Sequence, residues 1–395
     1  MQKDEKLNII CFSNQLWEFP LWTNKKHVMS HMAKLGHNVL FVDPPITTGR
    51  VFFKYLRAGN WGLYRLLTWQ YRDTGVRIFT PLNFLPFFGL LSKLHAYLIN
   101  RLAKKYFDPE RKTVVWVYHV EIPGIESYLN NIERDVLVYD CVDNYAAFPR
   151  YDTPEKKEKI QNQENYLATE ADVVFTTAPG LYDRMEKLNP NTHYTPNVGD
   201  YEKFSKAPNY ANKLPEDLKE ISRPRIGFAG SVDEYKFDRE LVKKIAKEHP
   251  KYSFVILGPM GLSDQDATPE SLGFADLKNV HFLGVRPYEI LEQYYAGFDA
   301  YIIPYQLNDY TVGGCFPVKF HDALAVGLPI IVTDLPAYRP FARVSYISKN
   351  YDEFSKNIRK ALDEDTDKLR EERKKVAHEN SWNGKVVKML ELLPL

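Results

Sequence analysis

Residues 316–334 read FPVKFHDALAVGLPIIVTD, a helix start followed by a turn and a strand. Pro317 suits the first turn of a helix, where its missing N–H costs nothing. Residues 323–326 are small and apolar, as expected of a helix that packs under a sheet. The first turn of this helix instead carries two charged residues, Lys319 and Asp322. They are three residues apart and so share one face of the helix. A cation and a carboxylate at the start of an otherwise apolar helix need an explanation.

A bound phosphate would explain this polar pair. The strand at 300–305 is followed by QLNDYTVGGCF (306–316), which we expect to be a Gly-rich loop. Free amides of the loop and the helix start would form an anion site, to which Lys319 adds a charge. The carboxylate of Asp322 only accepts hydrogen bonds and would suit a ribose diol. The alternative is a solvated, capped first turn, and these residues alone leave both explanations open.

A second loop supports a ligand. GFAGSVDEYKFD (227–238) follows a strand that begins near residue 225. Gly230 and Ser231 place a small turn with several N–H donors at the end of that strand, which suits a diphosphate. A tight strand-to-helix turn is the alternative. Two such loops at the same edge of one sheet together indicate a nucleotide diphosphate site.

Strands and helices alternate along the whole chain. Strands rich in Val, Ile and Phe, with helices between them, predict a parallel sheet that is covered on both faces. In the first half, strands are expected at 7–13, 38–45, 76–82, 113–119, 135–141 and 172–178, and helices at 24–35, 90–106, 155–168 and 181–188. A second series of strands starts at residue 225, with helices beginning near Asp238, Pro287, Pro317 and Asp352.

A chain of 395 residues exceeds one ordinary core, so two domains are expected. The linker is placed at HYTPNVGDYEKF (193–204) and the polar stretch up to Arg223. We expect one domain at 1–198, with a C-terminal helix at 381–395 packing back on it, and a second at 199–380. Each would be a doubly wound, Rossmann-like α/β domain, with the ligand in a cleft between them.

Composition excludes several classes of protein. A formal net charge of +1 argues against general nucleic-acid binding. Cys11, Cys141 and Cys315 are far apart in apolar settings, as expected of free thiols in a reducing compartment. No Cys/His cluster suggests zinc, and no run of 18 apolar residues could span a membrane. The N-terminal MQKDEKLNIICFSN has no signal-peptide pattern, so a cytoplasmic protein is expected.

One segment is strongly basic and aromatic. Residues 44–107 contain ten Lys and Arg and a single acid, Asp73. Aromatic rings beside cations in 49–72 suit an interface with anionic lipid, whereas the alternative is domain core with solvated cations. We expect the helix at 90–106 to be core on one face. The predicted membrane contacts are Phe52, Phe53, Lys54, Arg57, Trp61, Arg65 and Trp69.

Taken together, these motifs resemble a known family. The pattern from Pro317 to Pro329 resembles the P-x-K-x-x-E-x-L-A-x-G-x-P signature of bacterial GT-B glycosyltransferases, above all the teichuronic-acid-type enzymes of surface polysaccharide synthesis. LGVRPYEILEQYYAGFDAYIIPY (283–305) and PNVGDYEKF (196–204) resemble further parts of their donor domain and linker. YDCVDNYAAF and the segment around WEFPLWTNKKHVMSHMAKLGHNVLFVDPP resemble acceptor-domain motifs.

The resemblance implies sugar transfer from a nucleotide-sugar, with UDP-sugar as the default donor and no metal or other cofactor. Lys319 would neutralise the leaving diphosphate and Asp322 would hold the ribose. The family's usual Glu is Asp322 here, and the second Glu of many retaining relatives is Gly314, which disfavours a retaining mechanism. The candidate donor-binding residues are Gly230, Ser231, Arg286, Thr311, Pro317, Val318, Lys319 and Asp322.

On the acceptor side, the strand DVLVYDC (135–141) leads into Asp140 and Asp143. An acid at the matching place in the inverting xanthan glucuronosyltransferase looks like the base, and inverting transfer needs a carboxylate to take the acceptor's hydroxyl proton. We expect Asp143 to do this, with Asp140 in reserve; a turn cap is the alternative for Asp143. His119 ends the strand 113–119 and is a further catalytic candidate, or a structural hydrogen-bond donor.

Two other polar features are expected to lie at the surface. Lys25 and Lys26 stand where relatives often have an Arg, but a solvated helix start explains them better than a ligand site. Asp264 and Asp266 form a D-x-D, which holds a metal in GT-A glycosyltransferases, yet here they occupy a polar loop. We therefore expect activity that resists EDTA.

These features predict a glycosyltransferase that is peripheral on the inner face of the cell membrane. Its partners would be a nucleotide-sugar, a lipid-linked or membrane-bound glycan acceptor and an anionic lipid surface. The alternatives are a nucleotide-sugar 2-epimerase of the same architecture and a non-catalytic scaffold that keeps the fold.

Overall fold

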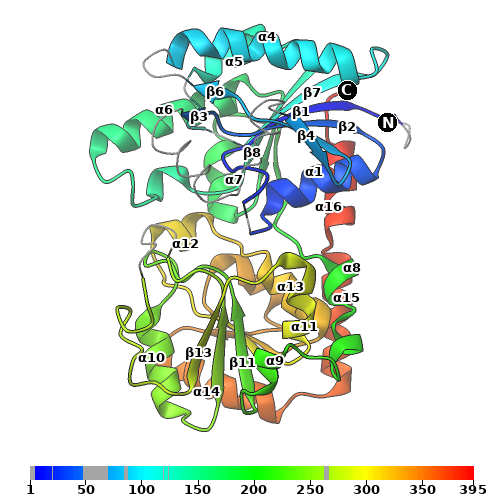
Figure 1. Cartoon of the computed structure of the whole chain (residues 1–395). Helices are drawn as coiled ribbons and strands as arrows, with labels where there is room; N and C mark the ends of the chain where they lie inside the picture. Colours follow the sequence, from blue (N-terminus) through cyan, green and yellow to red (C-terminus); the bar gives the residue numbers. More distant parts are fainter. Residues whose placement is uncertain are drawn as a thin grey trace. The chain divides into compact units, whose positions relative to one another are not determined.

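The computed structural model describes residues 5–19, 21–47, 70–83, 88–118, 120–122, 124–261 and 267–395. The chain divides into two compact units. Unit 1 comprises Met1–Thr176, Leu181–Thr195 and Val386–Leu395, and unit 2 comprises Thr177–Gly180 and Pro196–Lys385. Figure 1 shows that each unit contains one large sheet with helices around it.

The sheet of unit 1 has the strand order β10-β9-β8-β7-β1-β2-β5-β4 among the described residues. All its neighbouring strands are parallel except β4 and β5. The strands are β1 (Asn8–Phe12), β2 (Asn38–Val42), β4 (Gln70–Asp73), β5 (Val76–Phe79), β7 (Thr113–Val117), β8 (Val136–Cys141), β9 (Val173–Thr176) and β10 (Thr192–Tyr194). A separate pair is β3 (Ile46–Thr47) with β6 (Leu82–Asn83).

Helices cover both faces of this sheet. Figure 1 shows α1 (Asn24–Lys34) on one face and α4 (Phe88–Tyr106) with α5 (Ile125–Asn131) on the other. The remaining elements are the 3-10 turn η1 (Tyr145–Ala147), α6 (Pro154–Glu170), α7 (Pro179–Met185) and α16 (Trp382–Glu391). Because both faces are covered, central strands such as β1 and β8 are buried along their whole length.

The sheet of unit 2 is entirely parallel, with the order β13-β12-β11-β14-β15-β16. Its strands are β11 (Arg225–Ala229), β12 (Ser253–Leu257), β13 (Val280–Gly284), β14 (Ala300–Ile303), β15 (Ile330–Thr333) and β16 (Tyr346–Ser348). Its α-helices are α8 (Tyr201–Phe204), α9 (Glu216–Lys219), α10 (Arg239–Glu248), α11 (Leu291–Tyr295), α12 (Asp309–Gly314), α13 (Lys319–Val326), α14 (Tyr351–Asp363) and α15 (Asp367–Glu379). The prediction of two doubly wound α/β domains is thus confirmed.

Two local predictions need correction. The polar stretch up to Arg223 is not a free linker, because its Phe204 and Leu218 are buried in the core of unit 2. The Gly-rich segment 306–316 is not wholly a loop, since α12 lies within it. A capping box starts α12: the Asn308 side chain accepts from the amide of Thr311, and the Thr311 hydroxyl oxygen accepts from the amide of Asn308.

Several sequence predictions concern residues that the structure leaves out. The predicted membrane contacts between Phe52 and Trp69 lie outside the described residues, as does the D-x-D at 264–266. Cys11, Cys141 and Cys315 are free thiols, as predicted; the first two are buried as expected, whereas Cys315 is only partly buried. Among the helices in the described ranges, none combines the length and the apolar character needed to cross a bilayer.

One histidine in unit 2 is buried without a hydrogen-bond partner. Both ring nitrogens of His321 in α13 lack one within the described part of the chain, and the side chain is fully buried. The rings of Phe316, Phe320 and Phe341 surround it, with centroids 5.4, 5.2 and 4.9 Å away. Burial therefore lowers the pKa of His321 to about 3, so this imidazole stays neutral in the folded protein.

This burial predicts a stability that falls with acid. The unfolded chain takes up a proton on His321 below its ordinary pKa of about 6.5, whereas the folded chain does not, so stability is lost as pH falls. Between ~pH 7 and ~pH 5 the loss from one such histidine is about 2 kcal/mol. In His321→Leu we expect a correspondingly smaller loss in urea unfolding at the two pH values. Equal losses in the variant and the native chain would contradict this.

Candidate active site

The best-defined polar site in unit 2 lies where the strand order reverses, between β11 and β14. Lys319 opens α13, and its ammonium lies 3.2 Å from the Tyr305 hydroxyl and 4.6 Å from the centre of the Phe228 ring. Burial, and then the nearby charge of Lys236, lower the pKa of Lys319 to about 7. A cation held among aromatic rings with this pKa has much to gain from an anion.

Gly230 leaves the space that this ammonium occupies. A Cβ atom built on Gly230 would lie 1.9 Å from Lys319 Nζ and 3.1 Å from the Phe228 ring. The backbone at Gly230 also has φ of +156°, which disfavours a side chain. The structure therefore brings together two predicted donor-site residues, Gly230 and Lys319, from segments far apart in the sequence.

The next residues of this loop add polar groups. Ser231 is 7% exposed, and its hydroxyl has no hydrogen-bond partner among the described residues. Asp233 lies close enough to Lys319 to raise its pKa, and Lys236 lies close enough to lower it. A buried hydroxyl without a partner normally costs free energy. A ligand that accepts a hydrogen bond from Ser231 would remove that cost.

Asp322 lies in the same helix but has a protein partner. Its Oδ1 accepts a 2.8 Å hydrogen bond from the backbone amide of Asp200. Burial raises the pKa of Asp322 well above its usual range, and this amide and Lys319 oppose the rise. The Tyr288 hydroxyl donates to Asp200 Oδ2 over 2.8 Å. Asp322 therefore anchors the segment before α8, a role that the sequence did not predict.

The segment 196–200 is held against the start of α13 at two further points. Asn197 Nδ2 donates to the Phe316 carbonyl over 2.8 Å. A Cβ atom on Gly199 would lie 2.7 Å from the His321 carbonyl carbon and 2.8 Å from the Asp322 amide nitrogen, so only glycine fits there. The motif PNVGD thus positions the helix that carries the polar pair.

Four other predicted donor residues occupy different surroundings. Thr311 is fully buried, and its hydroxyl is occupied in the capping box, so the structure gives it a structural role. Arg286 binds the Asp217 carboxylate at 2.6 Å and the Tyr294 hydroxyl at 2.7 Å. Pro317 and Val318 form the turn before α13, where Pro317 is buried and Val318 is the N-cap residue.

Unit 1 has a second polar cluster where its own strand order reverses, around β1, β7 and β8. Asp140 of β8 is 1% exposed, and its Oδ2 accepts a 3.1 Å hydrogen bond from the Trp116 indole. Burial and then the Asp140 charge raise the pKa of the Tyr118 hydroxyl well above its usual range. Asp140 is therefore a buried hydrogen-bond acceptor near the end of β8.

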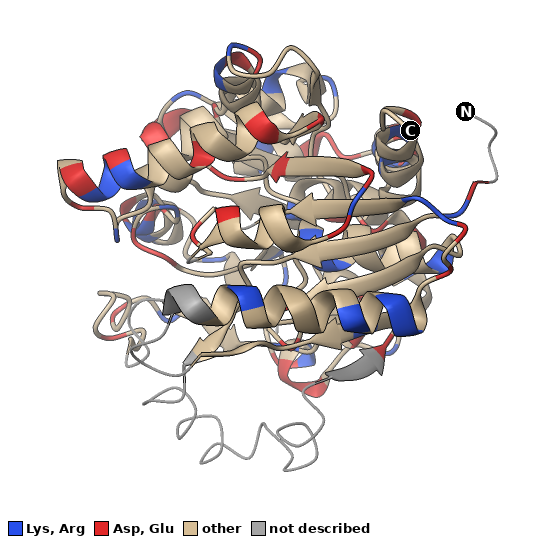
Figure 2. Cartoon of the chain, turned by 90° about the horizontal axis from the view of Figure 1, so that it is seen from above, with Lys and Arg blue, Asp and Glu red and all other residues tan. Residues whose placement is uncertain are grey.

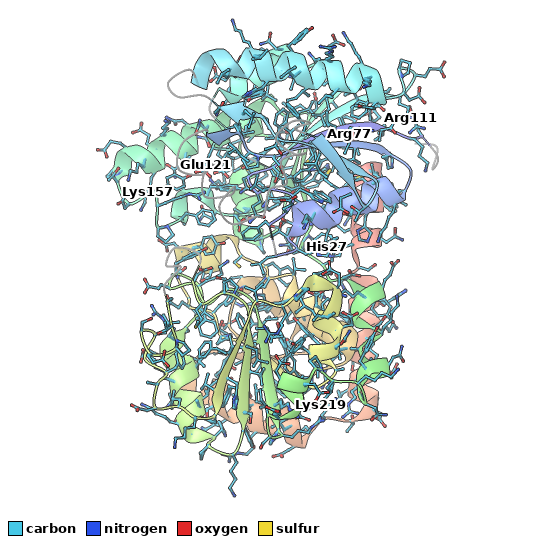
Figure 3. All side chains as sticks on the ribbon, in the orientation of Figure 1. His27, Arg77, Arg111, Glu121, Lys157 and Lys219 are labelled. Atoms are coloured by element: carbon cyan, nitrogen blue, oxygen red, sulfur yellow. The ribbon has the colours of Figure 1, made fainter. Side chains whose placement is uncertain are left out.

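Lys25 supplies the positive charge of the cluster. It is 3% exposed, with its ammonium 5.8 Å from the centre of the Tyr118 ring. Burial lowers the pKa of Lys25, and the charges of Asp143 and Asp140 raise it. The expectation of a solvated Lys25 is thus wrong, because α1 turns this side chain into the sheet edge. His27 from the same helix is also buried (Figure 3).

Asp143 is the more accessible of the two acids. It follows β8, is partly exposed, and lies within electrostatic reach of Lys25. The next residues turn inward, where the Tyr145 hydroxyl donates to the Tyr118 carbonyl over 2.8 Å. His119 lies outside the described residues. The described part of this edge therefore combines one buried acid, one partly exposed acid and one buried cation.

Sequence reasoning missed most of the residues that complete these two clusters. Tyr305, Asp233, Asp200 and Tyr288 were not candidates, although all four belong to segments that the sequence analysis singled out. Their local pattern carries no signal that marks them as site residues.

Among the residues that the structure describes, no group of three or more His, Cys, Asp or Glu side chains is arranged to hold a metal ion.

Removing the Lys25 charge should destabilise unit 1. In Lys25→Met, Asp140 and Asp143 would lose their buried counter-charge, and we expect a decrease of about 3 kcal/mol in the free energy of unfolding. Lys26→Met is the matched control, because Lys26 is only partly buried and lies over the Trp17 and Trp22 rings. It should cost less than about 1 kcal/mol. Equal effects in urea unfolding would rule out the buried charge cluster.

Comparison with known proteins identifies relatives in sequence and in fold. Residues 223–364 match the family model described as glycosyl transferases group 1. The chain is 26% identical over 307 residues to a Bacillus subtilis (strain 168) protein that carries the name of a teichuronic acid biosynthesis glycosyltransferase, TuaH. That match covers 72% of each chain.

Solved structures show the same fold at low identity. HepE of Anabaena in complex with UDP-glucose has a TM-score of 0.69 at 15% identity, over 98% of this chain and 99% of that one. Sucrose-phosphate synthase of Thermosynechococcus elongatus has a TM-score of 0.67 at 13% identity, over 98% of both chains. Residues 223–364 therefore match the glycosyl transferases group 1 family model, and the whole chain has the GT-B fold of two Rossmann-like domains.

Proposed function

We propose that the protein transfers a hexose from a nucleotide-sugar, with UDP-sugar as the donor, to a membrane-bound glycan acceptor in surface polysaccharide synthesis. The single observation that carries the proposal is the Lys319 ammonium, held beside Gly230 at the switch point of unit 2. It lies at the carboxyl edge of a parallel sheet, where such folds bind nucleotides. The HepE structure with UDP-glucose supports the choice of donor.

The residues around Lys319 fit a nucleotide diphosphate. The diphosphate would keep Lys319 protonated, and the Ser231 hydroxyl would donate to a phosphate oxygen. Asp322 uses one carboxylate oxygen for the Asp200 amide, and the other is the natural acceptor for a ribose hydroxyl. This arrangement neutralises the leaving group with protein charges alone, so we propose a transfer that needs no metal ion.

Nucleotide binding tests this proposal directly. We expect UDP, in the presence of EDTA, to raise the melting temperature of the native chain more than GDP, ADP or CMP does. Stabilisation at a hundredfold excess over Kd is about 2.7 kcal/mol for a single site. Lys319→Met should abolish the shift, and so should Gly230→Ala, because its methyl group would displace the ammonium.

Asp322→Asn tests the charge of Asp322 separately from its structural role. It keeps an oxygen for the Asp200 amide but loses the charge. It should fold normally and bind UDP more weakly than the native chain, whereas Asp322→Ala would also lose the anchor of segment 196–200. A shift with another nucleotide would change the proposed donor. If none of the four nucleotides shifts the melting temperature, the proposed enzyme activity is wrong and a non-catalytic scaffold is favoured.

For the chemical step we propose inversion, with Asp143 as the base. Asp143 is the partly exposed acid of unit 1, and Gly314 leaves unit 2 without the second Glu of many retaining relatives. An exposed carboxylate can receive the acceptor's hydroxyl proton as the anomeric carbon is attacked. Asp140 is poorly suited to this task because it is buried and bonded to Trp116.

Asp143→Asn should therefore block transfer without preventing donor binding. We expect incorporation of labelled sugar into glycan to fall by about 10²–10⁴-fold, since the amide cannot accept a proton. The UDP-induced melting shift should stay as in the native chain, which separates a chemical defect from misfolding. NMR of the product linkage should show the anomer opposite to that of the donor. Near-native turnover would remove Asp143 from this role.

The membrane-bound acceptor is the part of the proposal that rests on sequence. The basic, aromatic segment 49–72 suits an anionic lipid surface, and the relative TuaH carries the name of a teichuronic acid biosynthesis enzyme. A 2-epimerase of the same fold would act on a free nucleotide-sugar and would need no such segment. Production of an epimerised nucleotide-sugar without any acceptor would favour that alternative.

A further inference from the structure

Helix α4 of unit 1 has an outer face that neither cluster of site residues uses. Its sequence FGLLSKLHAYLINRLAKKY contains no acid and four cations. In Figure 2 this helix carries Lys and Arg and no Asp or Glu. Leu94 and Tyr97 are 49% and 60% exposed, which makes them two of the most exposed large apolar side chains in the described chain. Isolated exposed apolar residues are common, but here they share a face with the cations.

The outward-facing residues form one narrow arc. At about 100° per residue, the exposed side chains of α4 fall within roughly 120° of the helix circumference. They are Lys93, Leu94, Tyr97, Arg101, Lys104 and Lys105. Ser92, His95, Ala96 and Ile99 lie on the opposite side and are buried. The helix is therefore amphipathic in an unusual sense, because its outer face combines apolar and positively charged side chains.

The inner face holds the helix firmly in place. His95 bridges the Tyr128 hydroxyl at 2.7 Å and the Leu82 carbonyl at 2.9 Å. At the C-terminal end, the guanidinium of Arg77, labelled in Figure 3, lies 3.3 Å from the centre of the Tyr106 ring. A rigid helix presents its outer face without a cost in ordering, which favours association with a surface.

Among the described residues, most cations on this face have no ion-pair partner. Lys104 has an ion pair with Glu133 at 2.9 Å, and both side chains are well exposed. Lys93, Arg101 and Lys105 have no ion pair with any residue in the described ranges. The nearest acids in sequence, Asp108 and Glu110, follow the helix, and Asp108 is paired with Arg111. Within the described ranges, three cations without an ion pair therefore flank an exposed tyrosine and leucine, and this combination suits an anionic partner with an apolar layer.

We propose that this α4 face, defined by Lys93, Leu94, Tyr97, Arg101 and Lys105, lies on an anionic lipid bilayer. Tyr97, near the centre of the arc, would sit at the headgroup level and Leu94 would enter the acyl boundary, while the cations pair with lipid phosphates. This inference deepens the proposed membrane location and rests on it, but it is independent of the transfer reaction. It places the lipid contact on a helix that the sequence predicted to be core on one face.

Vesicle flotation of the full chain tests the face. The native protein should float with vesicles that contain about one third phosphatidylglycerol, and far less with pure phosphatidylcholine. Binding should weaken strongly between ~0.05 M and ~0.5 M NaCl, because the cations contribute through screened charge. The triple variant Lys93→Gln/Arg101→Gln/Lys105→Gln should lose at least about tenfold in partitioning. Tyr97→Ser should also weaken binding, and its loss should persist at high salt.

The matched control removes the same charge elsewhere. Lys157→Gln/Lys159→Gln/Lys187→Gln changes three exposed lysines of unit 1 that lie outside α4. It should float like the native chain, and UDP should stabilise both triple variants as it stabilises the native protein. If both triple variants float equally well, the proposal for the α4 face is wrong, but the proposed membrane location stands. If the native chain does not float at all, both the face and the membrane location fall, and the nucleotide site is unaffected.

Discussion

The hydrogen bond from the Asp200 amide to Asp322 organises unit 2 around its functional edge. It ties the segment 196–200 to the first turn of α13, and Gly199 allows this approach because no side chain would fit against His321. The same bond occupies one oxygen of the carboxylate that we assign to the ribose. An acceptor that is already half satisfied by a backbone amide is oriented before the ligand arrives, so less ordering remains for binding to impose.

The two units use the same physical device for different purposes. Each sheet reverses its strand order, and each places a buried or half-buried lysine at that point. Lys319 has aromatic neighbours, and burial and the charge of Lys236 lower its pKa more than Asp233 and Asp322 raise it, so an incoming anion would stabilise its charge. Lys25 lies beside Asp140 and Asp143, so its charge is satisfied within the protein. This difference is consistent with the proposal that unit 2 binds the diphosphate and that Asp143 of unit 1 acts as the base.

The fold was predictable because its signals are local and repeated. Apolar strands at 113–117 and 136–141, with helices between them, suffice to indicate a parallel sheet covered on both faces. Lys319 stood out because a charge in an apolar helix is unexpected, and Gly230 because a small residue followed a strand. α12 was missed because a run with two glycines suggests a loop, whereas the Asn308 capping box supplied the missing stability.

The remaining residues depend on contacts between distant parts of the chain. Lys25 is flanked by polar residues and looks solvated, yet α1 turns it toward acids more than a hundred positions away in the sequence. Asp200 looks like an ordinary helix cap, and only its contact with Asp322 shows that it also supports the site. The outer face of α4 also could not be predicted from the sequence, in this case because residues that look apolar turn out to be exposed. Periodicity identifies an amphipathic helix, but only the fold decides that Tyr97 and Leu94 point outward beside the cations. The proposal that α4 faces a lipid surface rests on that arrangement.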